Sequence, residues 1–273
     1  MKLKQLVVAV SLSLGLVACG GGGSSSSSSS DSSYDFKVTA VDGYLNNAIV
    51  TATCGTQTFT GVTDENGEVQ LDTNGIDSKD CSVVITANPD GSTTDMDTGE
   101  TYAAGELYLV SPAGQDKTDL IASPFTTMVA LLMESSGDLD AAIAEVALQF
   151  GIAPSLVTGD FIAAQAADTE LKEEAQKAAL KATALLASLP QTADEFAADV
   201  ADTSTTQTLI AKLLKINDAV EAEIAELENS GTDLSSVIIT VEVAADGSVT
   251  TVVEDKPQAT GATDSSVGGG TGS

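Results

Sequence analysis

An acidic stretch between Asn88 and Tyr102 holds the side chains best suited to bind a metal ion. Its candidate ligands are four carboxylates, Asp90, Asp95, Asp97 and Glu100. Calcium binds several hard oxygen ligands, which one short loop can supply. The spacing does not follow the EF-hand pattern, so a solvated acidic loop is the favoured interpretation. A weak calcium site is the alternative.

A hydroxyl cluster at residues 123–127, Ser-Pro-Phe-Thr-Thr, also invites a chemical interpretation. A hydroxyl in such a cluster can act as a nucleophile if a base activates it. Serine is equally a preferred helix N-cap, and proline is favoured at the first helical position. Capping explains the cluster without chemistry, so we expect a helix to begin after Ser123.

Composition removes most catalytic mechanisms. The chain has no histidine and no arginine, which excludes Ser-His and Cys-His pairs, imidazole zinc ligands and guanidinium clamps. Composition does not exclude two catalytic mechanisms, one with a lysine-activated serine and one with a pair of carboxylates. A glycosidase cleft normally needs aromatic surface, however, and the chain has no tryptophan and only 4% aromatic residues. We therefore predict that the protein is not an enzyme and uses no cofactor.

The net charge bears on the class of partner. The 40 acidic residues against 11 lysines give a formal charge of -29. Nucleic-acid binding needs basic residues that displace counterions, so nucleic-acid partners are not expected. Strong negative charge keeps a protein soluble and attracts cations diffusely.

The N-terminus resembles the signal peptide of a bacterial lipoprotein. Lys2 and Lys4 precede an apolar run from Leu6 to Val17, which is too short to span a bilayer comfortably. Leu16-Val17-Ala18-Cys19 then resembles a lipobox. The resemblance implies cleavage between Ala18 and Cys19, with diacylglycerol and an N-acyl chain on Cys19, enough for stable anchoring. An ordinary cleaved signal with a spare cysteine is the alternative.

The resemblance also implies a location. Aspartate after the acylated cysteine usually retains such lipoproteins in the inner membrane, whereas this chain has Gly20. We therefore expect the outer membrane, on either face. Glycine and serine through Ser33 form a flexible tether.

Once Cys19 carries lipid, Cys54 and Cys81 remain in an oxidising compartment and are predicted to pair. That pairing would close a loop of roughly 27 residues and add about 3 to 4 kcal/mol. Metal ligation by these two cysteines is the weaker alternative.

Period-two alternation follows the tether and predicts short strands separated by turns. The predicted strands cover residues 36–41, 48–54, 58–62, 68–71, 82–87 and 107–110. Two segments, Val41 to Val50 and Thr63-Asp64-Glu65-Asn66-Gly67-Glu68-Val69, resemble the carboxypeptidase regulatory-like (transthyretin-like) modules of secreted bacterial proteins. The resemblance implies a small β-sandwich and says little about activity.

The second half changes to helical spacing. Helices are predicted after Ser123, from Asp138 to Gly151, over 169–189, near 193–200, and from Thr206 to Gly231, with a turn at Phe161. Alanine-rich stripes favour a bundle. A hairpin of 237–243 and 249–253 should pack on the helices, join the β-sheet or meet another subunit.

Together these features predict an α+β protein: a small disulfide-bonded β-sandwich, an alanine-rich helical bundle and a C-terminal β-hairpin. The predicted parts are a signal peptide (1–18), a tether (19–33), the β-sandwich (34–115), the helical domain (116–231), the hairpin (232–255) and a disordered tail (256–273). The expected role is a lipid-anchored structural or interaction protein with an envelope or extracellular protein partner. A carbohydrate- or calcium-binding surface module is the alternative.

Overall fold

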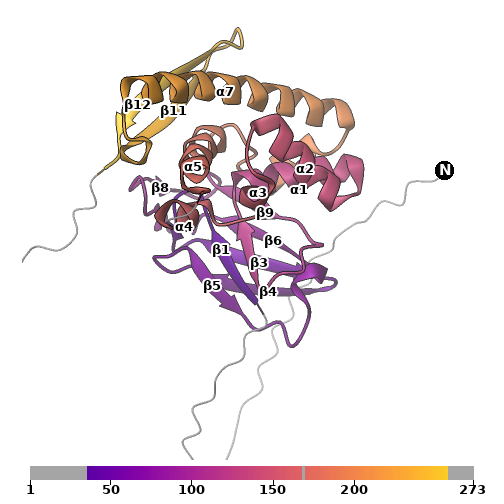
Figure 1. The fold of residues 1–273 in the computed structure, drawn as a ribbon. Coiled ribbons are helices and arrows are strands. Elements are labelled where there is room, and N and C mark those ends of the chain that lie inside the picture. Colours follow the sequence, from indigo (N-terminus) through magenta and orange to yellow (C-terminus); the bar gives the residue numbers. More distant parts are fainter. Residues whose placement is uncertain (1–35, 168–169, 258–273) are drawn as a thin grey trace, which may run out of the picture. The chain divides into compact units, whose positions relative to one another are not determined.

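Alternating apolar residues in the first half form most of the strands in the computed structural model, which describes residues 36–167 and 170–257 (Figure 1). The predictions for the signal peptide, Ala18, Cys19, the tether and the tail after 257 lie outside the described residues. The strands are β1 (Phe36–Ala40), β2 (Leu45–Asn46), β3 (Ile49–Cys54), β4 (Gln57–Val62), β5 (Glu68–Leu71), β6 (Cys81–Thr86), β7 (Thr93–Asp95), β8 (Thr101–Tyr102), β9 (Tyr108–Ser111), β10 (Asp119–Ala122), β11 (Val237–Val243) and β12 (Val249–Asp255).

The strands form several small sheets. One has the order β10-β1-β5, a second β4-β3-β6-β9 and a third β2-β7-β8. In the first sheet β1 runs antiparallel to β5 and parallel to β10, with Val38 opposite both Val69 and Leu120. The six predicted strands are confirmed within one or two residues. Strands β2, β7, β8 and β10 were not predicted.

The disulfide prediction is confirmed. Cys54 at the end of β3 lies opposite Cys81 at the start of β6, with the two Cα atoms 4.1 Å apart, and their sulfurs are bonded. Both cysteines are buried. The bond therefore joins two neighbouring strands of the four-stranded sheet.

Helical spacing in the second half produces seven α-helices in the described residues, all after β10 (Figure 1). They are α1 (Pro124–Ser136), α2 (Leu139–Phe150), α3 (Pro154–Val157), α4 (Phe161–Ala166), α5 (Lys172–Leu186), α6 (Ala193–Asp199) and α7 (Thr203–Ser230), with short 3-10 helices η1 (Ser78–Asp80) and η2 (Leu234–Ser236). Helix α2 begins after the predicted cap Asp138, whose side chain accepts from the Ala141 N–H, and ends at Gly151 in the left-handed conformation. The predicted turn at Phe161 is helix α4, capped by Asp160.

Two hydrophobic clusters hold the fold together. One contains buried residues of all three sheets formed by β1 to β10, and the other contains the buried faces of the helices. Each cluster also takes residues from the opposite half of the chain: Leu186 of α5 lies in the strand cluster, whereas Val41 and Ile121 lie in the helical cluster. Strands and helices therefore share their packing at this boundary.

The C-terminal hairpin packs on the helices, which was one of its three predicted placements. Strand β11 contacts α5, and β12 contacts α7 (Figure 1). Val237 and Ile239 of β11 are buried within the helical cluster. The Thr251 hydroxyl donates to the Glu223 carboxylate of α7 at 2.7 Å. An isolated two-stranded hairpin is marginal in water, so these contacts supply the stability that it lacks alone.

Candidate functional site

The hydroxyl cluster after β10 is a helix cap. The Ser123 hydroxyl accepts from the Thr126 N–H, and the Thr126 hydroxyl accepts from the Ser123 N–H at 2.8 Å and donates to the Val110 carbonyl at 2.7 Å. The Thr127 hydroxyl donates to the Ser123 carbonyl at 2.9 Å. All three side chains are fully buried, so the capping interpretation holds and these hydroxyls are already engaged.

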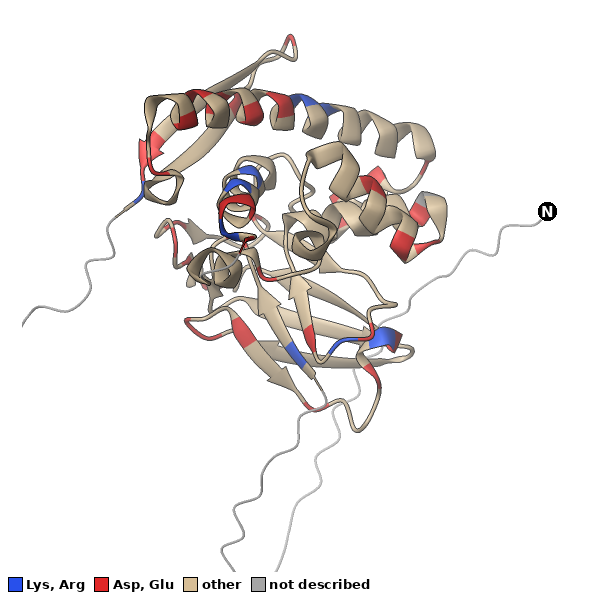
Figure 2. Cartoon of the chain, viewed as in Figure 1, with Lys and Arg blue, Asp and Glu red and all other residues tan. Residues whose placement is uncertain are grey.

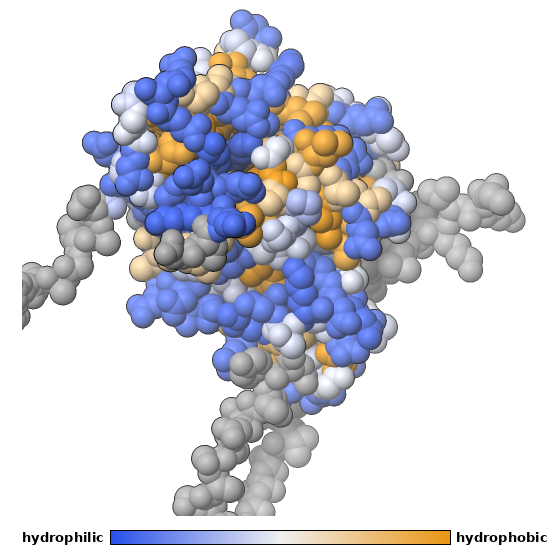
Figure 3. All heavy atoms as spheres, viewed as in Figure 1, coloured by the Kyte–Doolittle hydropathy of each residue, from blue (hydrophilic) through white to orange (hydrophobic). Residues whose placement is uncertain are grey.

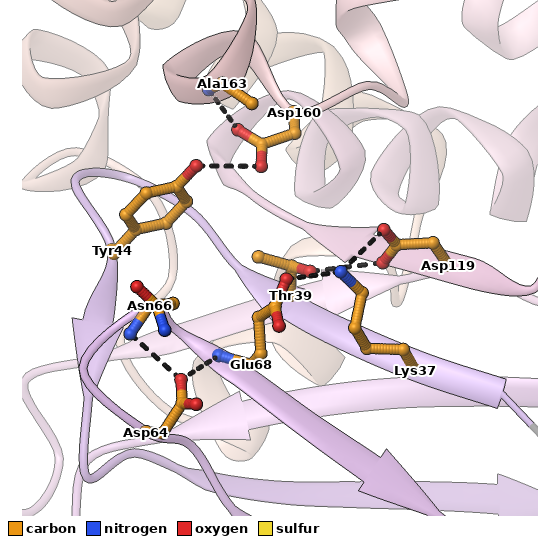
Figure 4. Close-up of polar contacts among 9 residues, drawn as sticks. All are labelled: Lys37, Thr39, Tyr44, Asp64, Asn66, Glu68, Asp119, Asp160 and Ala163. Atoms are coloured by element: carbon orange, nitrogen blue, oxygen red, sulfur yellow. Dashed lines mark hydrogen bonds and ion pairs between the residues drawn. The ribbon is translucent and has the colours of Figure 1, made fainter. Parts of the chain in front are cut away.

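A second polar cluster crosses the sheet β10-β1-β5 (Figure 4). Lys37 of β1 forms ion pairs with Glu68 of β5 and, at 3.0 Å, with Asp119 of β10. The Thr39 hydroxyl also donates to Asp119 at 3.1 Å. Partial burial acts against the charged amine, but hydrogen bonds and charge from the two carboxylates outweigh it and raise the pKa of Lys37. These carboxylates have partners from the chain itself and are structural.

Tyr44 connects the turn after β1 to the helices. Its hydroxyl donates to the Asp160 carboxylate at 3.0 Å, and that carboxylate accepts from the Ala163 N–H at 2.8 Å (Figure 4). Burial, with the negative charge of Asp160, raises the pKa of Tyr44. The contact fixes the turn Val41–Tyr44 against the first residues of α4.

A carbohydrate-binding surface would use the aromatic residues of the strand region, Tyr44, Phe59, Tyr102 and Tyr108, and these are mostly engaged within the protein. Tyr44 is bonded to Asp160, and only 7% of Tyr102 is exposed. The ring of Tyr108 lies 5.7 Å from that of Phe196 in α6. Phe59 is half-buried. All four rings are therefore buried or half-buried in the fold.

The four candidate calcium ligands are not arranged as a metal site in the described residues. Asp95 is fully buried and accepts from the Asp97 N–H at 2.7 Å and the Thr98 hydroxyl at 2.9 Å. Asp97 pairs with Lys256, and Asp90 accepts from the Ser92 N–H at 2.9 Å. Among residues 36–167 and 170–257, no three or more acidic or cysteine side chains are placed to hold a metal ion.

The expectation of a solvated loop is wrong for the middle of this stretch. Strands β7 and β8 pair with each other, and β7 pairs with β2, which encloses Asp95. Burial raises the pKa of Asp95, whereas its hydrogen bonds to Asp97 and Thr98 act in the opposite direction. The stretch lacks apolar alternation, so the sequence carried no local sign of these strands.

Asp42 is the residue that the sequence interpretation missed. It follows β1, is only 1% exposed, and neither carboxylate oxygen has a hydrogen-bond partner. Burial raises its pKa well above the ordinary value, and the negative charges of Asp95, Asp97 and Glu100 raise it further. A buried carboxylate without a partner is energetically costly, and such groups concentrate at functional sites.

Gly43 explains why Asp42 lies beside other carboxylates. A Cβ atom at position 43 would lie 1.9 Å from the Asp95 Oδ1 atom and 2.3 Å from the Asp97 Cβ atom. The turn after β1 can approach β7 this closely only because glycine has no side chain. Asp42 entered the sequence prediction only as part of this glycine turn, and the one available signal was an acidic residue directly after a buried strand.

A pocket of about 440 Å³ opens at Asp42. Its lining includes Glu100 and Tyr102 from the β7–β8 region, Leu186 and Ala187 at the end of α5, and Val241 of β11. Burial raises the pKa of Tyr102, as do the charges of Asp42, Asp95 and Glu100. The pocket thus combines carboxylates, a tyrosine ring and an apolar wall, and its volume lies within the usual range for small-molecule sites.

Comparisons with protein-family models, with curated proteins and with solved structures find no match to this chain. In the described part of the chain, no helix combines the length and apolar composition required to cross a membrane. The site must therefore be interpreted from its own geometry.

Proposed function

We propose that the protein is a non-enzymatic lipoprotein of a bacterial envelope that holds a protein partner. Cleavage after Ala18 would leave Cys19 as the acylated first residue, and Gly20 favours the outer membrane, on either face. The tether would then connect the anchor to the folded residues.

The observation that carries this proposal is the bond between Cys54 and Cys81. Disulfides form and persist in oxidising compartments, which favours an exported chain. The sequence has three cysteines, and the disulfide uses Cys54 and Cys81, so Cys19 is the remaining one. That cysteine is the one that follows the lipobox-like residues.

The finer architecture belongs to the same proposal. We interpret the sheets β10-β1-β5 and β4-β3-β6-β9 as the two layers of a transthyretin-like sandwich, because residues of both lie in one hydrophobic cluster. We interpret the helices as an alanine-rich bundle. Five buried alanines of α5 support close helix approach, at positions 175, 178, 179, 182 and 184.

The partner surface is proposed at the hairpin and the neighbouring helices. Hydrophobic side chains on one face gather over the helical part, whereas hydrophilic residues predominate over the strands (Figure 3). Val243 of β11 and Val252 of β12 are 36% and 40% exposed. Edge strands are templates for added strands, so the hairpin offers both backbone and apolar contacts. Acidic residues are spread over strands and helices (Figure 2), which favours a basic partner.

The anchor is tested by metabolic labelling with a fatty-acid analogue. The wild-type chain should be labelled and should fractionate with the outer membrane. The Cys19→Ser variant should lose both properties, whereas a Cys54→Ser/Cys81→Ser variant should keep its label. An unlabelled wild-type chain, or a Cys19→Ser variant that stays in the membrane, would contradict the proposal.

The partner surface is tested by site-specific photocrosslinking in cells. A photoreactive residue at Val252 should give one defined protein adduct. The same residue at Asp140, which is exposed on α2, is the matched control and should not give that adduct. An identical pattern from both positions, or no adduct from Val252, would argue against the hairpin as the contact surface.

A further inference from the structure

We propose that the pocket at Asp42 binds a small organic cation, an ammonium group on a short apolar chain, whose charge pairs with the Asp42 carboxylate. This inference does not depend on the anchor or on a protein partner. It rests on the buried carboxylate, the character of the pocket around it and the charges of its neighbours.

The first observation is the missing partner of Asp42. Both carboxylate oxygens are buried and without a hydrogen bond, although most buried polar groups in proteins are paired. Asp95, whose carboxylate lies against Gly43, accepts hydrogen bonds from Asp97 and Thr98. The same part of the fold therefore satisfies one buried carboxylate and leaves the other unpaired.

The second observation is the pocket itself. Asp42 is part of its lining, while its two unpaired carboxylate oxygens are buried, so a cation that pairs with them must enter beyond the open part of the pocket. Glu100 is exposed and offers a first carboxylate near the opening, whereas the buried Asp42 lies deeper. A volume of about 440 Å³ exceeds what a single ion requires.

The third observation is the absence of a basic residue at this place. No lysine lines the pocket among the described residues, and the charges that act on Asp42 there all come from acidic side chains. Lys256, which pairs with Asp97, lines a different pocket. A cation other than a proton that neutralises Asp42 must therefore come from outside the described chain.

The chemistry of the lining favours an organic cation over a metal ion. Calcium takes six to eight oxygen ligands, and no group of three or more acidic side chains is placed to hold an ion within the described ranges. An ammonium group needs fewer acceptors and is attracted to the face of a tyrosine ring, here Tyr102. Leu186, Ala187 and Val241 supply apolar surface for the attached carbon chain.

The test is isothermal titration of the purified full-length chain with n-butylamine, which is charged at neutral pH, and with n-butanol as its neutral counterpart. We expect saturable binding of the amine and none of the alcohol. The Asp42→Asn variant should bind the amine at least roughly tenfold more weakly, a loss of about 1.4 kcal/mol. Glu100→Gln should cause a smaller loss.

The matched control is Asp140→Asn, which removes one negative charge from an exposed position on α2. It should bind the amine as the wild type does. An equal loss in Asp140→Asn and Asp42→Asn would show that the amine senses net charge only and would overturn the proposal. So would unchanged binding by an Asp42→Asn variant with a normal thermal transition, or an Asp42-dependent response to calcium chloride without one to the amine.

Discussion

Acidic residues near the two ends of β1 differ in whether they have partners. At its start, Lys37 pairs with Glu68 and Asp119 on the neighbouring strands. Just after its end, Asp42 is buried beside Asp95 with neither a lysine nor a hydrogen bond. The first region satisfies its charges within the sheet and so contributes structure. The second leaves a buried carboxyl group without a hydrogen-bond partner at a pocket, which is why it is the candidate site.

Removal of the disulfide should have the largest effect on stability. It also tests whether the bond influences the two regions at the ends of β1. The Cys54→Ser/Cys81→Ser variant should lose about 2 to 4 kcal/mol of unfolding free energy, measured by urea denaturation, because the unfolded chain gains freedom. The ion pairs of Lys37 and the pH response of Asp42 should be unchanged. A change in that pH response would show that the disulfide also positions the acidic turn.

Gly43→Ala should be the next largest effect. The new methyl group would lie 1.9 Å from the Asp95 Oδ1 atom, so the turn must move away from β7. Overpacking of this kind costs about 1 to 3 kcal/mol. Thermal denaturation measures the loss, and the same change in an Asp95→Ala background should cost less because the obstructing oxygen is gone. Equal costs in the two backgrounds would mean that the Asp97 Cβ atom, 2.3 Å from the new methyl group, rather than the Asp95 oxygen, limits the approach, and would contradict the predicted role of Asp95.

Asp42→Asn should raise stability at neutral pH. The folded state raises the pKa of Asp42, so the unfolded chain releases this proton first and stability falls as pH rises above the ordinary aspartate value, near 3.9. The variant cannot ionise at this position and does not lose this stability, so its unfolding free energy should be higher by about 1.4 kcal/mol for each unit by which folding raises the pKa of Asp42. Asp95, Asp97, Glu100 and Tyr102 surround the group in both proteins.

The measurement for Asp42→Asn is the unfolding free energy between pH 3 and pH 8. The difference between variant and wild type should vanish below about pH 4, where Asp42 is protonated in both states. The Asp140→Asn variant should show no comparable pH-dependent gain. A constant difference at all pH values would mean that packing, rather than charge, separates the two proteins.

Lys37→Met should have the smallest effect, even though it removes two ion pairs. The side chains of Lys37, Glu68 and Asp119 are 24%, 37% and 46% exposed, so water can hydrate the remaining carboxylates. The expected loss is below about 1 kcal/mol and should shrink in high salt. The pKa of Lys37 is raised, so its contribution should be lost only as pH rises above the ordinary lysine value. A loss as large as that of Gly43→Ala would contradict the solvated character of these pairs.

Local signals account for what the sequence predicted well. Period-two alternation located β3 and β6, and capping residues located the start of α1 and both ends of α2. Helix α7 begins at Thr203, earlier than the predicted Thr206, because Asp202 rather than a hydrophobic residue starts it. These features depend on residues within one or two turns of each other, where spacing alone carries the information.

The pocket at Asp42 depended on contacts between distant segments. Tyr102 and Glu100 reach it through the pairing of β7 and β8, whereas Leu186 and Val241 reach it through the packing of α5 against β11. No local sequence pattern predicts contacts between such distant segments, so the pocket could not be predicted from the sequence. The calcium candidates likewise form no group of three or more that could hold a metal ion within the described residues, because closeness in sequence does not set the directions of side chains.

Sequence by itself determined that strands precede helices and that Ser123 caps a helix, because these follow from residues of a given type at a given spacing. It also determined the pairing of Cys54 with Cys81, because these are the two cysteines that remain once Cys19 is assigned to the lipid anchor. Only the tertiary structure decided that β10 pairs with β1, that the hairpin packs on α5 and α7, and that Asp42 is buried without a partner. Whether a side chain is buried, and whether its charge is paired, depends on which distant segments pack together. Those contacts form only when the whole chain folds.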